Sequence, residues 1–148
     1  MTLLERLQRE IQAAMLARDA DRLGTLRLLK SAIGYAQIEK KSDHLPDADV
    51  VAIVQKEVKK RRDAVEQYQA GGRPELAGRE AKEILVLESF LPQPFSATEL
   101  EQLARAVIQE LGALSKKDMG AVMKTIQAKA AGRADGKTIS GLVGRLLP

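Results

Sequence analysis

The sequence has no cysteine, no tryptophan and one histidine in 148 residues. The lack of cysteine excludes disulfides, thiolate metal sites, iron–sulfur clusters and cysteine nucleophiles. The one histidine, His44, lies in a polar segment beside Pro46, and no second ligand stands at metal spacing. The carboxylates are interleaved with lysine and arginine on helical patterns, and no pair is marked out for acid–base chemistry. We therefore expect no catalytic residue, no metal and no cofactor, and predict that the chain is not an enzyme.

Long apolar runs are also missing. No run approaches the ~20 residues that span a bilayer. Charged residues interrupt the first seventeen positions, which carry Glu5, Arg6, Arg9 and Glu10. This pattern predicts no secretory signal, no membrane partner and a cytoplasmic localisation.

Aromatic residues make up only 3% of the chain, so the core must be aliphatic. Apolar residues recur with the period of a helix almost everywhere, and no stretch alternates with period two for long enough to predict a strand. In the segment ending near Phe90, for example, the apolar stripe is Ala77, Ala81, Ile84, Leu85 and Leu87. We predict an all-α protein, with an N-terminal four-helix domain followed by a small three-helix C-terminal domain.

The domain boundary is predicted at the two closely spaced prolines, Pro92 and Pro94. Proline has no backbone N–H to donate within a helix, and it disfavours the helical conformation of the residue before it. The expected divisions are a helical domain over 1–91, a proline-rich linker over 92–96 and a helical domain over 97–148.

Helix ends carry their own signals. Thr2 with Glu5 and Ser96 with Glu99 have the spacing of a capping box, which marks a helix start. Gly71–Gly72 and Gly112 fit helix ends, because glycine takes the left-handed conformation there. Ser115 is expected to cap a further helix.

Residues 131–138 (Ala-Gly-Arg-Ala-Asp-Gly-Lys-Thr) resemble a phosphate-binding loop, with Ala131 in place of the first glycine. Such a loop follows a buried strand, and its amides wrap the phosphates. The preceding residues here are helical in pattern, and Asp135 would repel an anion. We favour a helix–helix turn in which Gly132 or Gly136 has positive φ and Asp135 caps the last helix.

The charge is unevenly distributed. Lysine and arginine number 24 against 20 acidic residues, a net charge of +4. Residues 97–148 hold eight of the basic and five of the acidic residues, so most of the excess lies there. A basic module favours an anionic partner, although many plain helical domains carry such an excess. Apart from Arg105, the basic residues of this part are Lys116, Lys117, Lys124, Lys129, Arg133, Lys137 and Arg145.

A second basic run lies in the helix predicted from Asp47. Lys56, Lys59, Lys60 and Arg62 spread over its solvent side, with acidic neighbours that make a solvated helix face the simpler interpretation. Arg61 lies towards the apolar stripe and must find a carboxylate or carbonyl groups. Gly120, in the C-terminal part, is expected to permit close helix packing.

Four separated stretches resemble the YqeY family of small bacterial proteins. They are Thr25–Ile33, Val54–Ala64, Glu83–Pro92 and Asp118–Met123, the last followed by Gly132–Gly136 and Ile139-Ser140. The resemblance covers essentially the whole chain. It implies an all-helical protein in two parts. The second part is similar to the tail domain of GatB, a component of the tRNA-dependent amidotransferase, and that tail domain helps to hold the tRNA.

This resemblance implies no activity. The chain has neither a kinase-like nor an amidase domain and no Ser-Ser-Lys arrangement, so a carbon–nitrogen ligase function with glutamine as donor would belong to the larger enzyme. We expect a non-catalytic module that contacts tRNA or another RNA. From charge, the contacts are assigned to Lys116, Lys117, Lys124, Lys129, Arg133 and Lys137, with Lys56, Lys59, Lys60 and Arg62 as a second patch. The alternative is a protein–protein adaptor that docks through the aliphatic helix Ile139 to Leu147.

Overall fold

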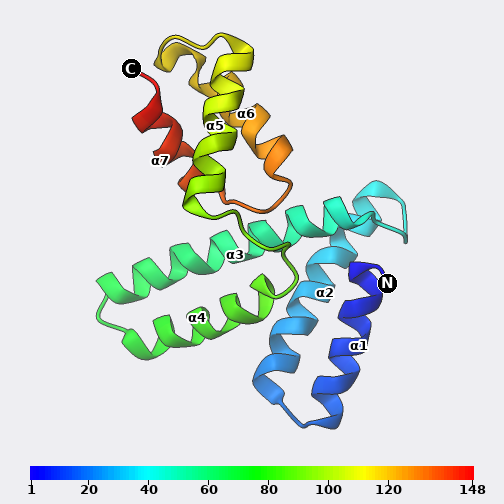
Figure 1. The fold of residues 1–148 in the computed structure, drawn as a ribbon. Coiled ribbons are helices and arrows are strands. Elements are labelled where there is room, and N and C mark those ends of the chain that lie inside the picture. Colours follow the sequence, from blue (N-terminus) through cyan, green and yellow to red (C-terminus); the bar gives the residue numbers. More distant parts are fainter. The chain divides into compact units, whose positions relative to one another are not determined.

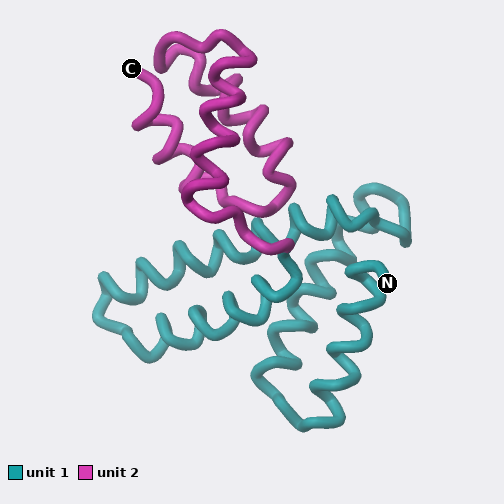
Figure 2. Tube along the Cα trace, viewed as in Figure 1, with its two compact units in different colours: residues 1–91 teal, residues 92–148 magenta.

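The computed structural model describes residues 1–148 and contains helices and no strands, which confirms the all-α prediction. The chain divides into two compact units, Met1–Leu91 and Pro92–Pro148 (Figure 2). Unit 1 contains α1 (Leu3–Leu16), α2 (Ala20–Lys40), α3 (Asp47–Ala70) and α4 (Pro74–Glu88). Unit 2 contains α5 (Ala97–Leu111), the 3₁₀ turn η1 (Lys116–Asp118), α6 (Met119–Ala130) and α7 (Gly136–Leu146) (Figure 1). No helix is both long and apolar enough to cross a bilayer.

The helix ends follow the signals in the sequence. Thr2 and Ser96 each form a capping box with the glutamate three residues later. Gly71 follows the last residue of α3, and Gly112 ends α5 with φ +63. Ser115 caps the turn η1, which leads directly into α6. These local contacts satisfy backbone groups that a helix end leaves without partners.

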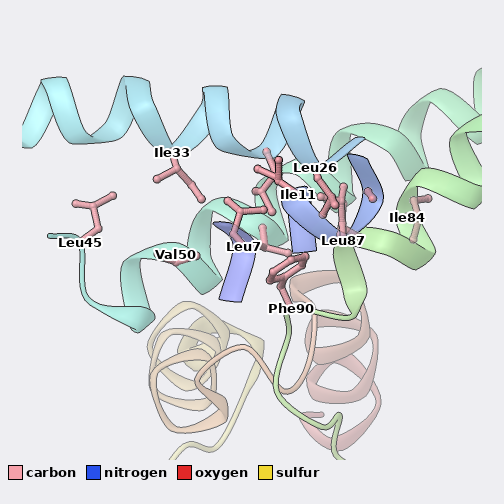
Figure 3. Close-up of a cluster of buried hydrophobic side chains, with 13 residues drawn as sticks. Leu7, Ile11, Leu26, Ile33, Leu45, Val50, Ile84, Leu87 and Phe90 are labelled. Atoms are coloured by element: carbon pink, nitrogen blue, oxygen red, sulfur yellow. The ribbon is translucent and has the colours of Figure 1, made fainter. Parts of the chain in front are cut away.

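Unit 1 is built from two helical hairpins, α1–α2 and α3–α4, whose apolar faces meet in one aliphatic core (Figures 1 and 3). Leu26, Val54 and Leu87 are completely buried there. Phe90, just beyond α4, closes the core, and the guanidinium of Arg6 lies 4.7 Å from its ring centroid. Arg6 also donates a 2.6 Å hydrogen bond to the carbonyl of Ser89, so it fastens the end of α4 to α1.

Arg61 satisfies the prediction made for it. It lies on α3 and is 9% exposed. Its Nη1 atom lies 3.1 Å from a carboxylate oxygen of Glu57 and 3.1 Å from the Glu57 carbonyl. Its Nε donates to Glu83 of α4 at 2.9 Å. The guanidinium therefore joins the two helices of the second hairpin through carboxylates on each.

Unit 2 has a separate core, formed by α5, α6 and α7. Val107, Val122, Ile126 and Val143 are fully buried in it. The aliphatic side of α7 faces this core. Ile139 and Leu142 of α7, and Leu147 just past its end, are buried in it. The adaptor hypothesis named the helix Ile139 to Leu147 as its docking surface. The aliphatic residues of this helix are buried in the core of unit 2, so only its other side is open to a partner, and the adaptor role itself stays a prediction.

Candidate nucleic-acid interface

The acidic side chains of unit 2 are all engaged by groups of the same unit. On α5, Glu101 pairs with Arg105 at 2.8 Å, Glu110 with Lys129 at 2.9 Å, and Glu99 lies 3.8 Å from Arg133. The other two carboxylates cap helices: Asp118 accepts from the amides of Leu114 and Ser115, and Asp135 from that of Thr138. Helices α6 and α7 contain no acidic residue. No acidic side chain of this unit is left to neutralise its remaining cations.

Four cations of unit 2 are exposed and have no ion-pair or hydrogen-bond partner at the side chain. They are Lys116, Lys117, Lys124 and Arg145. The C-terminal end of α7 lies beside the first turn of α6, since a Cβ on Gly144 would lie 4.0 Å from Met119 Cε. Figure 1 shows the C-terminus at the same end of the unit as the segment before α6. Arg145 is thus brought to the end that carries Lys116 and Lys117, although it is not among the RNA contacts that the sequence predicts.

The surface between Lys117 and Lys124 is made of small residues. Gly120 and Ala121 lie between them in the first turn of α6, and both are exposed. A Cβ placed on Gly120 would meet no atom within 4 Å. The expectation that Gly120 permits close helix packing is therefore wrong, because this glycine faces outward. Because glycine has no side chain, the surface between Lys117 and Lys124 is shallow at this position.

Arg133 holds the segment before α5 against the turn before α7. Its guanidinium lies 3.8 Å from the ring centroid of Phe95, and its Nε donates to the Gln93 carbonyl at 2.9 Å. The Phe95 amide in turn donates to the Arg133 carbonyl at 2.9 Å. The proline-rich segment predicted as a linker is thus attached to unit 2, and the guanidinium of Arg133 is occupied by contacts within that unit.

Glu99 completes this arrangement. Hydrogen bonds from the Ser96 side chain and backbone lower the pKa of its carboxyl, and the nearby charge of Arg133 acts in the same direction. Both contacts favour the ionised form. The carboxylate that caps α5 therefore also provides the negative charge that Arg133 faces.

The segment 131–138 is a helix–helix turn, as favoured above. Ala131 and Gly132 have positive φ, at 47° and 88°, and Asp135 caps α7. The segment follows a helix, so it lacks the strand that a phosphate-binding loop requires. Lys137, in the first turn of α7, is exposed and takes part in interactions within the protein.

The second basic patch lies on α3 and is partly neutralised. Lys60 lies 3.6 Å from Glu57, and Arg62 lies 3.5 Å from Glu88 of α4. Lys56 and Lys59 are exposed and have no ion-pair partner. The patch offers two free lysines beside several carboxylates, whereas the end of unit 2 around α6 offers four free cations and no free acidic side chain.

Comparison with known proteins identifies relatives along most of the chain. A model of the YqeY-like proteins matches residues 4–147. An uncharacterised protein of Schizosaccharomyces pombe is 33% identical over 87 residues, which cover 59% of this chain and 70% of the relative. Altered inheritance of mitochondria protein 41, mitochondrial, of Vanderwaltozyma polyspora is 26% identical over 120 residues (76% of this chain, 64% of the relative). Its namesake in Kluyveromyces lactis is 27% identical over 135 residues (91% and 70%).

The names of these relatives correct one prediction. The proteins from Vanderwaltozyma polyspora and Kluyveromyces lactis are named as mitochondrial, which contradicts the cytoplasmic localisation expected for this chain. The charged residues among the first seventeen positions bear on secretion and do not determine the compartment. The chain spans 64% to 70% of the length of the three relatives. Since the family model matches nearly every residue, this protein belongs to the YqeY-like family.

Proposed function

We propose that this protein contacts RNA, with tRNA as the expected class, through the cationic end of unit 2, and that it has no chemistry of its own. The observation that carries the proposal is the set of four free cations, Lys116, Lys117, Lys124 and Arg145, in a unit whose acidic side chains are all engaged. Such cations suit contact with phosphates and recognition of shape. The resemblance of this part to the amidotransferase tail domain, which helps to hold tRNA, supports the same class of ligand.

The contacts within unit 2 change which of the predicted residues we expect to contribute most to RNA affinity. Lys129 and Arg133 contact groups of their own unit, so an RNA phosphate would have to compete with Glu110 and with the Phe95 ring. Lys117, Lys124 and Arg145 have no such competitor. We therefore place the main contact at the end of unit 2 that contains the start of α6 and the end of α7, and assign Lys56 and Lys59 to a second, weaker contact.

We infer in addition that the two units are separately folding domains, with four helices in the first and three in the second. Each unit has its own hydrophobic core. On this view the RNA contact belongs to a small domain whose charge is distinct from that of its neighbour.

Removal of three charges tests the RNA contact. In the variant Lys117→Gln/Lys124→Gln/Arg145→Gln, affinity for labelled tRNA should fall by about 10- to 100-fold at low salt. The slope of log K against log salt should decrease by about two to three, because each lost phosphate contact contributes roughly 0.7–0.9. Fluorescence anisotropy at several salt concentrations, with a random RNA duplex as competitor, measures both quantities.

The matched control removes three exposed and unpaired charges from unit 1, as Arg9→Gln/Arg79→Gln/Lys82→Gln. Its net charge equals that of the test variant, so it should bind nearly as the unmodified chain does. Equal loss in both variants would show that only net charge matters and would defeat the site. Unchanged affinity and slope in the test variant would defeat it as well.

Gly120→Leu separates binding from packing. Because Gly120 is exposed in a helix, the leucine should leave stability unchanged or raise it by up to about 1 kcal/mol. It should weaken tRNA binding several-fold, because a bulky side chain would stand between Lys117 and Lys124. The control is Gly78→Leu on α4, where the glycine is also exposed within a helix, a Cβ also meets nothing within 4 Å, and none of the four free cations of unit 2 is adjacent. Thermal unfolding and anisotropy on both variants provide the comparison, and a marked loss of stability in Gly120→Leu would restore the packing role.

A further inference from the structure

Helix α2 carries a second apolar stripe, on the side that faces away from the core. Leu28 is 54% exposed, Tyr35 74% and Ile38 76%. With Ser31 between them, the positions 28, 31, 35 and 38 are spaced by three, four and three residues, which places them on one helix face. The core-facing residues Leu26, Leu29 and Ile33 lie on the opposite face. No charged residue belongs to the stripe, so it does not suit an RNA backbone.

Two glycines within α2 have no role inside the fold. Gly24 continues the stripe towards the N-terminus of the helix, and Gly34 lies at its margin. Neither has positive φ, and a Cβ on either would meet no atom within 4 Å. A glycine inside a helix costs roughly 0.5–1 kcal/mol relative to alanine. Small residues on an outer helix face allow a helix from outside to approach closely, which would offset this cost.

We propose that this stripe is the contact of a symmetric homodimer in which α2 packs antiparallel against α2 of a second copy. A two-fold interface must be complementary to itself. The positions 28, 31, 35 and 38 are symmetric about position 33, so their spacing is the same in both chain directions. A two-fold axis near Ile33 and Gly34 therefore sets Leu28 of each copy against Ile38 of the other. The same axis sets Tyr35 against the small Ser31. The antiparallel arrangement also brings opposite ends of the two helix dipoles together.

The size of the stripe sets the strength expected of this dimer. With the axis near Ile33, the paired segment runs from Leu28 to Ile38 and rises about 15 Å at 1.5 Å per residue. A contact one helix wide and about three turns long falls at the low end of specific interfaces, below about 1,200 Å² in total. Interfaces of that size are weak or transient, so we expect dimerisation at protein concentrations on the order of 100 μM.

Sedimentation equilibrium of the full chain between about 5 and 500 μM tests the proposal. The average mass should rise with concentration towards twice the monomer mass. In Tyr35→Asp/Ile38→Asp the association should weaken by at least about 100-fold, because a dimer would then bury four unpaired carboxylates. The control is Leu85→Asp on α4, where a leucine outside the stripe is 70% exposed. It should associate as the unmodified chain does.

A monomer at every concentration would overturn the proposal, as would equal association of the stripe variant and the unmodified chain. If this face binds a different protein instead of a second copy, the unmodified chain should sediment as a monomer, which also overturns the homodimer. Circular dichroism on each variant confirms that the substitutions, all at exposed positions, leave the fold intact. The measurement uses no RNA, so its failure would leave the proposed function standing, and failure of the RNA test would leave the dimer standing.

The absence of cysteine provides a test of the orientation. Ser31→Cys introduces the only thiol of the chain, close to the proposed axis. A short bismaleimide should join two copies of this variant rapidly at dimerising concentrations. Leu85→Cys should cross-link at the slow rate of random collision. Equal rates for the two variants would contradict contact through α2, even if a dimer forms.

Discussion

Replacement of Arg61 by methionine should lower the free energy of unfolding by about 3–5 kcal/mol, the cost expected when one partner of a buried ion pair is removed. Arg61 is 9% exposed and contacts carboxylates of Glu57 and Glu83 at 3.1 and 2.9 Å. Methionine fills much of the same space but provides no charge. The carboxylates of Glu57 and Glu83 would then lose the cation that they share, and the ion pair between Lys60 and Glu57, at 3.6 Å, would remain. Urea unfolding followed by circular dichroism measures the loss.

Two further variants show whether burial or charge produces this effect. Arg62→Ala removes the neighbouring arginine, which is exposed and lies 3.5 Å from Glu88, so it should cost less than about 1 kcal/mol. Glu57→Gln/Arg61→Met/Glu83→Gln removes the stranded carboxylates as well and should recover a large part of the loss. A loss below about 1 kcal/mol in Arg61→Met, equal to that in Arg62→Ala, would contradict the account.

The fold was predictable where local chemistry determines it. Capping residues, glycines and prolines mark helix ends within a few residues, because these groups act on the backbone next to them. Helix faces are harder to assign. Leu85 fits the apolar period of α4 and yet is 70% exposed, and the outer stripe of α2 is apolar without facing the core. Periodicity records that a face is apolar but does not record whether the chain itself covers it.

The candidate site was only partly predictable, for a related reason. The sequence indicates that residues 97–148 carry excess positive charge, but which cations are free depends on contacts distant in the chain. Lys129 meets Glu110, nineteen residues before it, and Arg133 meets Gln93, forty residues before it. Arg145 joins Lys116 and Lys117 because the hairpin of α6 and α7 returns the chain to that end. Gly120 was misjudged because a helical glycine can face either a neighbour or solvent.

Core truncation in each unit should produce the other large effect, and it tests whether the units fold separately. Leu26 in unit 1 and Ile126 in unit 2 are both 0% exposed. Leu26→Ala and Ile126→Ala should each cost about 2–5 kcal/mol, since each removes buried methyl groups and leaves a cavity. If the units are separate domains, each substitution should destabilise only the unit that contains it.

The aromatic composition provides a probe for this test. Both tyrosines, Tyr35 and Tyr68, lie in unit 1, and there is no tryptophan. Tyrosine fluorescence during urea unfolding therefore reports on unit 1, whereas circular dichroism reports on the helices of both. Ile126→Ala should leave the fluorescence midpoint in place while part of the helical signal is lost at lower urea. Leu26→Ala should move the fluorescence midpoint instead.

Because a unit of this small size buries a modest share of its surface, Ile126→Ala should unfold unit 2 at low urea. A common shift of both signals in both variants would show one cooperative fold, and the RNA contact would then depend on the stability of the whole chain.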